Sequence, residues 1–199
     1  SFELETNYRT DLEALTRINK ALQGCTYALK SPVKRIYSEN SPSKGGRLYT
    51  RLQGLPDRRA RIRINTLLNG EPVAEVDLSA NHPRMIMALA NKELSPSFYD
   101  DIAKATETTR EQVKFLIVKA IGAKDRRISL KPKGADNFWM NDDFVVTPKE
   151  RKLIEDHLGE RYPDLCRGLY TSFGSELQAF EGDILLKAML DLLDQGIVS

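Results

Sequence analysis

The sequence predicts an α+β fold, in which a small antiparallel sheet is joined by a larger set of helices. The segment 61–77 alternates apolar and polar residues around Asn69-Gly70, which is the pattern of a β-hairpin with a tight turn. Helical periodicity occurs on both sides of this segment, and most helices follow it in the chain. Apolar residues make up 41% of the 199 residues, and no apolar run approaches the roughly 20 residues that cross a bilayer.

The helices are expected where apolar residues recur every three or four positions behind a capping residue. The expected helical ranges are 10–22, 82–89, 98–106, 108–121, one that opens at 147–150, and 176–193. Thr108 with Glu111 predicts a capping box, and Ser79 or Asn81 is expected to cap the helix from residue 82. By contrast, the Ser-, Gly- and Pro-rich segment 38–46 predicts a mobile loop.

Composition excludes few classes of function. The net charge of +2 neither predicts nor excludes a nucleic-acid partner, because the distribution of charge matters more than its sum. Basic residues gather over 47–63 and over 124–133, although a solvated surface explains such clusters as well. Cys25 and Cys166 lie in no motif and predict reduced bystander thiols in a cytoplasmic protein, and no zinc or P-loop motif is present.

One acid, Asp77, follows the predicted strand 73–77 and precedes a predicted helix. A carboxylate at such a junction is a common ligand for a divalent cation. Mg²⁺ in particular uses one or two carboxylates together with water and substrate phosphates. The alternative is that Asp77 is an ordinary surface or helix-capping acid.

Two cations, Arg110 and Lys114, are four residues apart and are therefore expected on one face of a helix. The apolar run FLIV that follows predicts that this helix is otherwise largely buried. A triphosphate would suit such a pair, with arginine as a fork and lysine as a point charge. An ordinary ion-pair network that includes Glu111 is the alternative. His82 alone predicts a core histidine or a helix N-terminal donor rather than a catalytic group.

The segment DLSANHPR resembles the first catalytic motif of family A DNA polymerases, the DNA polymerase I type. Asp77, Ser79 and Arg84 have the matching spacing, and His82 stands where the family has its steric-gate glutamate. Arg84 favours the DNA branch over the single-subunit RNA polymerases, which carry glutamine there.

Three further segments resemble the same family in the same order. The matching residues are Gly46, Arg47, Leu48, Leu52, Gln53 and Pro56 in GGRLYTRLQGLP; Arg110 and Lys114 in the fingers helix; and Gln178, Asp183, Ile184, Ala188 and Met189 in LQAFEGDILLKAM. Val118 and Gly122 replace the aromatic residue and the tyrosine of the family's fingers helix. His82 and Gly122 thus replace two residues that the family uses to reject ribose and to stack the template, so the sugar preference is open.

The resemblance implies a role for each matched residue. Asp77 and the backbone carbonyl of Leu78 would hold two Mg²⁺ ions, and Arg110 and Lys114 would grip the triphosphate across an open groove. Ser79 and His82 would lie beside the nucleotide. The residues expected to face primer-template or to organise the palm are Arg47, Gln53, Arg84 and Gln178.

The resemblance also implies an organisation of the chain. We expect an N-terminal helix and linker over 1–44, palm segments over 45–90 and 175–199, and a fingers-like helical region over 91–174. The family's second catalytic aspartate would lie beyond residue 199, so we expect this chain alone not to polymerise. We expect no membrane association, and the oligomeric state is open. Two other functions compete with this one: a non-catalytic nucleic-acid-binding module with a palm-like fold, and an unrelated α+β interaction protein.

Overall fold

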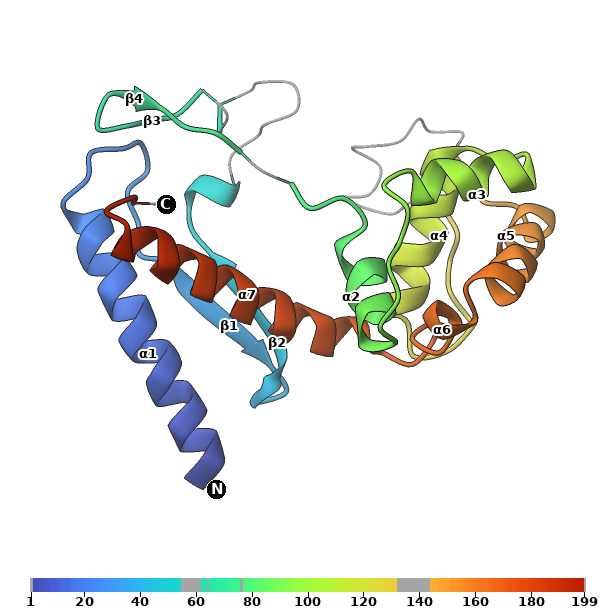
Figure 1. The fold of residues 1–199 in the computed structure, drawn as a ribbon, viewed down its shortest axis with the longest axis horizontal. Coiled ribbons are helices and arrows are strands. Elements are labelled where there is room, and N and C mark those ends of the chain that lie inside the picture. The colour runs from blue at the N-terminus through green and yellow to red at the C-terminus, as the bar shows by residue number, and fades with distance from the viewer. Residues whose placement is uncertain (1, 55–61, 64, 76, 132–143, 199) are drawn as a thin grey trace. The chain divides into compact units, whose positions relative to one another are not determined.

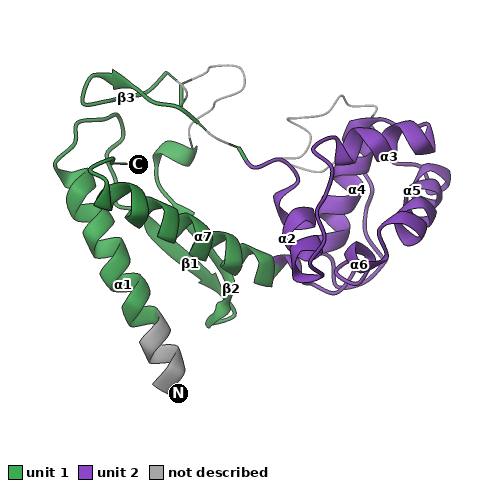
Figure 2. Cartoon of the chain, in the orientation of Figure 1, with its two compact units in different colours: residues 1–77, 175–199 green, residues 78–174 purple. Residues whose placement is uncertain are grey.

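The computed structural model describes residues 2–54, 62–63, 65–75, 77–131 and 144–198, with side chains from residue 8 onward. These residues form seven α-helices and two antiparallel two-stranded sheets, which confirms the predicted α+β class (Figure 1). They divide into two compact units, unit 1 with residues 1–77 and 175–199 and unit 2 with residues 78–174 (Figure 2). The expected palm segment 45–90 is thus shared between the units. No helix in the described part of the chain has the length and apolar content of a membrane-spanning segment.

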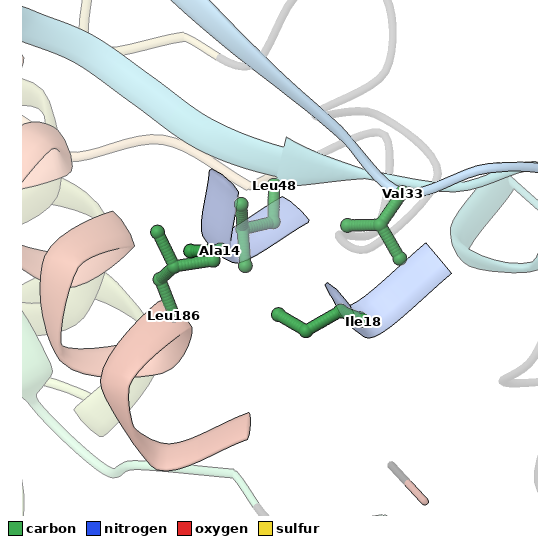
Figure 3. Close-up of a cluster of buried hydrophobic side chains, with 5 residues drawn as sticks. All are labelled: Ala14, Ile18, Val33, Leu48 and Leu186. Carbon is green, nitrogen blue, oxygen red and sulfur yellow. The ribbon is translucent and has the colours of Figure 1, made fainter. Parts of the chain in front are cut away.

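Unit 1 is built on two long helices and a hairpin. Its elements are α1 (Phe2–Gln23), β1 (Lys34–Ser38), β2 (Ser41–Tyr49), a 3-10 helix (Leu52–Gly54), β3 (Leu67–Leu68), β4 (Glu71–Pro72) and most of α7 (Gly174–Asp194). Helices α1 and α7 confirm the predicted helices 10–22 and 176–193, although each begins earlier than expected. The buried cluster between them consists of Ala14, Ile18, Val33, Leu48 and Leu186 (Figure 3). Burial of each large aliphatic side chain contributes about 1.5–3 kcal/mol to stability.

The prediction of a loop over 38–46 is wrong, because this segment forms the β1–β2 hairpin. Glu39 and Asn40 make a two-residue turn with φ of 55° and 51°. Gly45 and Gly46, both at φ +72°, lie where the register between the strands shifts. Glycine adopts this left-handed backbone without steric cost, so the Gly-rich composition that indicated a loop serves an irregular strand instead.

The hairpin expected over 61–77 is present but much shorter. Asn69 and Gly70 form its turn with φ of 54° and 87°, and they join β3 to β4. Residues 73–75 and 77 are not in a strand, so the prediction that Asp77 ends one is wrong. Ala74 and Glu75 are exposed, so the alternating pattern has no buried face there to hold it as a strand. Residues 61, 64 and 76 lie outside the described residues.

A buried guanidinium joins four elements of unit 1. The side chain of Arg35 is only 2% exposed, and it forms ion pairs with Asp11 at 3.0 Å and Asp183 at 2.7 Å. It also donates to the backbone carbonyls of Gly46 at 2.8 Å and Ala179 at 3.0 Å. Burial raises the pKa of Asp11, although the positive charge of Arg35 favours its ionised form. Arg35 therefore connects β1 to α1, β2 and α7 through directed polar contacts.

Unit 2 is a helical assembly. Its helices are α2 (Asn81–Leu89), α3 (Phe98–Thr106), α4 (Arg110–Gly122), α5 (Pro148–Arg161) and α6 (Pro163–Cys166). The first four confirm predicted helices, and the short α6 was not predicted. Their largest fully buried side chains include Phe98, Ile102, Leu116, Ile117, Ile154, Leu158 and Leu165.

Two caps in unit 2 differ from the predictions. The capping box of α4 is formed by Thr109 and Gln112, one residue later than predicted, because the backbone N–H of Thr108 donates to Ala103 and closes α3. The N-cap position of helix α2 is Ala80, at φ 53°, and not Ser79 or Asn81 as predicted. Helix α5 begins with a capping box formed by Thr147 and Glu150, which confirms a helix that opens at 147–150.

Helix α7 approaches β2 so closely that position 182 accepts only glycine. A Cβ at Gly182 would overlap the carbonyl oxygen of Gly46 and come within 3.0 Å of the Arg35 guanidinium. We predict that Gly182→Ala lowers the free energy of unfolding by about 1–3 kcal/mol, as overpacking does elsewhere. Urea denaturation measures this loss.

Gly159→Ala is the matched control for this variant. Gly159 is also a helical glycine, in the last turn of α5, but a Cβ there would meet no atom within 4 Å. We expect this substitution to raise stability by up to about 1 kcal/mol, because alanine restricts the unfolded chain more than glycine does. Equal effects of the two variants would contradict the close approach of α7 to β2.

Candidate functional site

Apart from Glu111 in its first turn, the exposed residues of helix α4 form one stripe. The stripe consists of Arg110, Lys114, Val118 and Gly122, each four residues from the next and each exposed. Val118 is 52% exposed, and a Cβ at Gly122 would meet no atom within 4 Å. The rest of the helix is largely buried, with Val113, Phe115, Leu116, Ile117, Ala120 and Ile121 in the core. The four positions that the resemblance selects are therefore on one accessible face.

Arg110 is held at the start of this stripe by the neighbouring helix α3. Its Nε lies 3.3 Å from a carboxylate oxygen of Asp100, and its guanidinium lies over the ring of Tyr99 at 5.7 Å from the centroid. Burial raises the pKa of Tyr99 to about 12 despite the nearby charge of Arg110, so its phenol is neutral at physiological pH. An ion pair of the kind weighed as an alternative is thus present, with Asp100 as the partner.

Both ends of α4 are fixed by hydrogen bonds. At the N-terminus, the Gln112 side chain accepts from the backbone N–H of Thr109 and donates to a carboxylate oxygen of Glu150 at 2.9 Å. At the C-terminus, the backbone N–H of Tyr170 donates to the carbonyl of Ala120 at 2.7 Å. These contacts fix α4 relative to α5 and to the segment before α7 within unit 2.

The side chain of Tyr170 lies within a compact ionic network. Its ring faces the guanidinium groups of Arg126 and Arg151, each 5.4 Å from the ring centroid. Its hydroxyl donates to Glu155 and accepts from Arg151 at 3.1 Å. Burial and the carboxylate of Glu155 raise the pKa of Tyr170 to about 12. Part of the basic cluster predicted over 124–133 is therefore neutralised internally; Lys133 lies outside the described residues.

Asp77 is the last residue of unit 1, and Arg110 and Lys114 belong to unit 2. The Asp77 carboxylate is exposed, as are Leu78 and Ser79. One carboxylate and the Leu78 carbonyl are hard oxygen donors of the type that Mg²⁺ prefers, and substrate phosphates and water supply the remaining ligands in many sites. Among the described residues, no group of three or more acids, histidines or cysteines gathers that could hold a metal alone.

His82 and Arg84 lie in the first turn of α2, and both are partly buried. The guanidinium of Arg84 donates to three backbone carbonyls, those of Ser79 at 2.9 Å, Leu94 at 3.0 Å and Ser95 at 3.3 Å. Arg84 therefore braces the start of α2 against the segment that leads into α3, which is an organising role within unit 2.

The remaining predicted residues lie in unit 1. Arg47 on β2 is partly exposed and forms an ion pair with Glu181 at 3.2 Å. The Gln53 side chain accepts from the backbone N–H of Thr50 and caps the short 3-10 helix. Gln178 is half-buried in the first turns of α7. In the basic segment 47–63, Arg58, Arg59 and Arg61 lie outside the described residues.

Sequence patterns did not reveal two residues that contact Arg110. Tyr99 and Asp100 are ten residues away or more in the chain, on a different helix, and meet Arg110 only through the packing of α3 on α4. The sole local signal is the pair Asp100-Asp101 in the first turn of α3, which is an ordinary feature of a helix N-terminus.

No family model, curated protein or solved structure matches the chain.

The Tyr170 network predicts a pH-dependent contribution to stability. Burial opposes ionisation of Glu155, but hydrogen bonds from Tyr170 and Arg151 and the charge of Arg126 outweigh it and lower its pKa below 4.5. The Glu155 carboxylate therefore binds a proton more tightly in the unfolded chain than in the folded protein. The stabilisation by ionised Glu155 is present above pH 4.5 and is lost as pH falls through the lowered pKa. We predict that Glu155→Gln costs about 1–3 kcal/mol at pH 7, and that the cost shrinks below pH 4.5.

Urea unfolding at several pH values measures this difference. Glu160→Gln, on the exposed face of the same helix, removes the same charge and should change stability by under about 0.5 kcal/mol. A Glu155→Gln cost that stays constant down to pH 3 would contradict the lowered pKa.

Proposed function

We propose that this chain is the palm and fingers portion of a template-directed nucleotidyltransferase of the family A DNA polymerase type. The observation that carries the proposal is the exposed stripe of α4, because its four positions coincide with those of the family's fingers helix. Arg110 and Lys114 place two cations one helical turn apart on this exposed stripe.

The chemistry of the stripe suits a triphosphate. An arginine fork can donate two parallel hydrogen bonds to phosphate oxygens, and a lysine one turn further adds a mobile point charge. The fixed ends of α4 hold the backbone that carries both groups, so little reorganisation would be needed on binding. Gly122, where the family has a tyrosine, leaves the end of the stripe open.

In the proposed enzyme, Asp77 and the Leu78 carbonyl would hold Mg²⁺. The bound ions would activate a primer 3′-hydroxyl and stabilise the leaving pyrophosphate. Arg110 and Lys114 would bind the phosphates on which negative charge develops. Arg47 would contact the primer-template backbone, which gives affinity without sequence preference.

The first test is binding of a nucleoside triphosphate by isothermal titration calorimetry in the absence of metal. We expect Arg110→Ala and Lys114→Ala each to weaken binding about tenfold, because each removes a charge-assisted hydrogen bond. Arg161→Ala and Lys104→Ala are matched controls, since both cations are exposed on unit 2 but outside the stripe. Equal effects of all four variants would mean that the triphosphate responds to the overall charge of unit 2, and would contradict a binding role of the stripe.

The second test concerns Asp77 and separates the enzyme from a binding module. We expect Mg²⁺ to strengthen triphosphate binding by the wild-type chain and Asp77→Asn to abolish this enhancement, while metal-free binding stays unchanged. Glu71→Gln, another exposed acid of unit 1, is the control. A retained enhancement in Asp77→Asn would favour the non-catalytic nucleic-acid-binding module.

A further inference from the structure

We infer that Asp100 is a built-in competitor for the phosphate-binding guanidinium of Arg110, and that it weakens the binding of every anion that uses this group. The inference rests on the proposed function, because it assigns a regulator to the same stripe of α4. It uses only contacts within unit 2.

The contact between these two residues is of a kind that a ligand can displace. The single ion-pair distance is 3.3 Å, and the side chains of Arg110 and Asp100 are 42% and 60% exposed. A contrasting pair in the same unit, Arg151 with Glu155, is 2.8 Å apart, with side chains only 20% and 14% exposed. Exposed pairs are weak because water screens the attraction and both side chains lose freedom on pairing. Asp100 therefore holds Arg110 only lightly.

Tyr99 keeps the guanidinium near the stripe whether or not Asp100 holds it. The Tyr99 side chain is buried, and its ring lies beneath the Arg110 guanidinium at 5.7 Å. A cation is attracted to the face of an aromatic ring, and the nitrogens at the edge of a stacked guanidinium stay available for hydrogen bonds. An incoming phosphate can thus replace the Asp100 carboxylate without removing Arg110 from its ring.

The competition has a defined thermodynamic form. When a fraction of Arg110 is occupied by Asp100, the apparent dissociation constant of any ligand that needs Arg110 rises by the inverse of the free fraction. The factor is the same for a triphosphate substrate and for a pyrophosphate product. Asp100 would therefore make product release easier while it weakens substrate binding to the same extent.

Asp101 provides a matched comparison. It is the next residue in the first turn of α3 and carries the same charge, but its carboxylate accepts from the Ser97 hydroxyl at 2.9 and 3.0 Å. Removal of either charge changes the net charge of the helix by one. Only the Asp100 substitution also removes the contact with Arg110.

The experiment measures the dissociation constants of a nucleoside triphosphate and of pyrophosphate, without metal, for the wild-type chain, Asp100→Asn and Asp101→Asn. We expect Asp100→Asn to bind both ligands about 1.5- to 5-fold more tightly, as loss of an exposed pair allows. Asp101→Asn should change both constants by less than Asp100→Asn does. The gain should shrink at high salt, where exposed charges are screened.

The same titrations in the Arg110→Ala background distinguish the possible failures. If Asp100 acts through Arg110, Asp100→Asn gives no gain once Arg110 is absent. Equal gains from Asp100→Asn and Asp101→Asn, or weaker binding by Asp100→Asn, would overturn the inference and leave the proposed function standing. Unchanged binding by Arg110→Ala itself would instead overturn the proposed function of the stripe.

Discussion

The burial of the apolar residues of α4 decides which of its side chains can meet a ligand, and beyond Glu111 in the first turn it leaves one exposed stripe. Its apolar residues are fixed in the core of unit 2, and Gln112 and Ala120 tie its ends to neighbouring segments. A rigid helix holds side chains at a fixed spacing, whereas a loop would not. Arg110 and Lys114 therefore stay one turn apart on the same exposed face. The proposed chemistry of unit 2 depends on this constraint.

The packing of unit 1 depends on a different interaction, the buried guanidinium of Arg35. Removal of a guanidinium from water is costly, and the cost is offset here by two carboxylates and two backbone carbonyls. Two of these partners, Gly46 and Asp183, belong to the motifs that carry the family resemblance. Their observed contacts are structural, since they hold β2 and α7 together. A motif residue can therefore be explained by packing, independently of any contact with substrate.

The helices could be predicted from sequence because their signals are local. Periodicity and the Thr147–Glu150 capping box lie within a few residues of each other, whereas β1–β2 depends on a turn at Glu39–Asn40 and on packing against distant helices. The strand predicted over 73–77 is absent among its described residues, because an alternating sequence specifies neither a partner strand nor a buried face. The shared face of Arg110 and Lys114 could be predicted from their spacing, but the contact with Asp100 could not, because Asp100 reaches Arg110 only through tertiary packing.

The two interpretations of Arg110, as half of an ion pair and as a phosphate ligand, are compatible. An exposed arginine without any partner would sample many rotamers, and ordering it on binding would cost affinity. The ring of Tyr99 restricts those rotamers, and the weak pair with Asp100 keeps the charge solvated and exchangeable. A stronger, buried carboxylate in place of Asp100 would hold the guanidinium against any anion, as Glu155 holds Arg151. It is therefore the weakness of the Asp100 contact that makes Arg110 suitable for reversible binding.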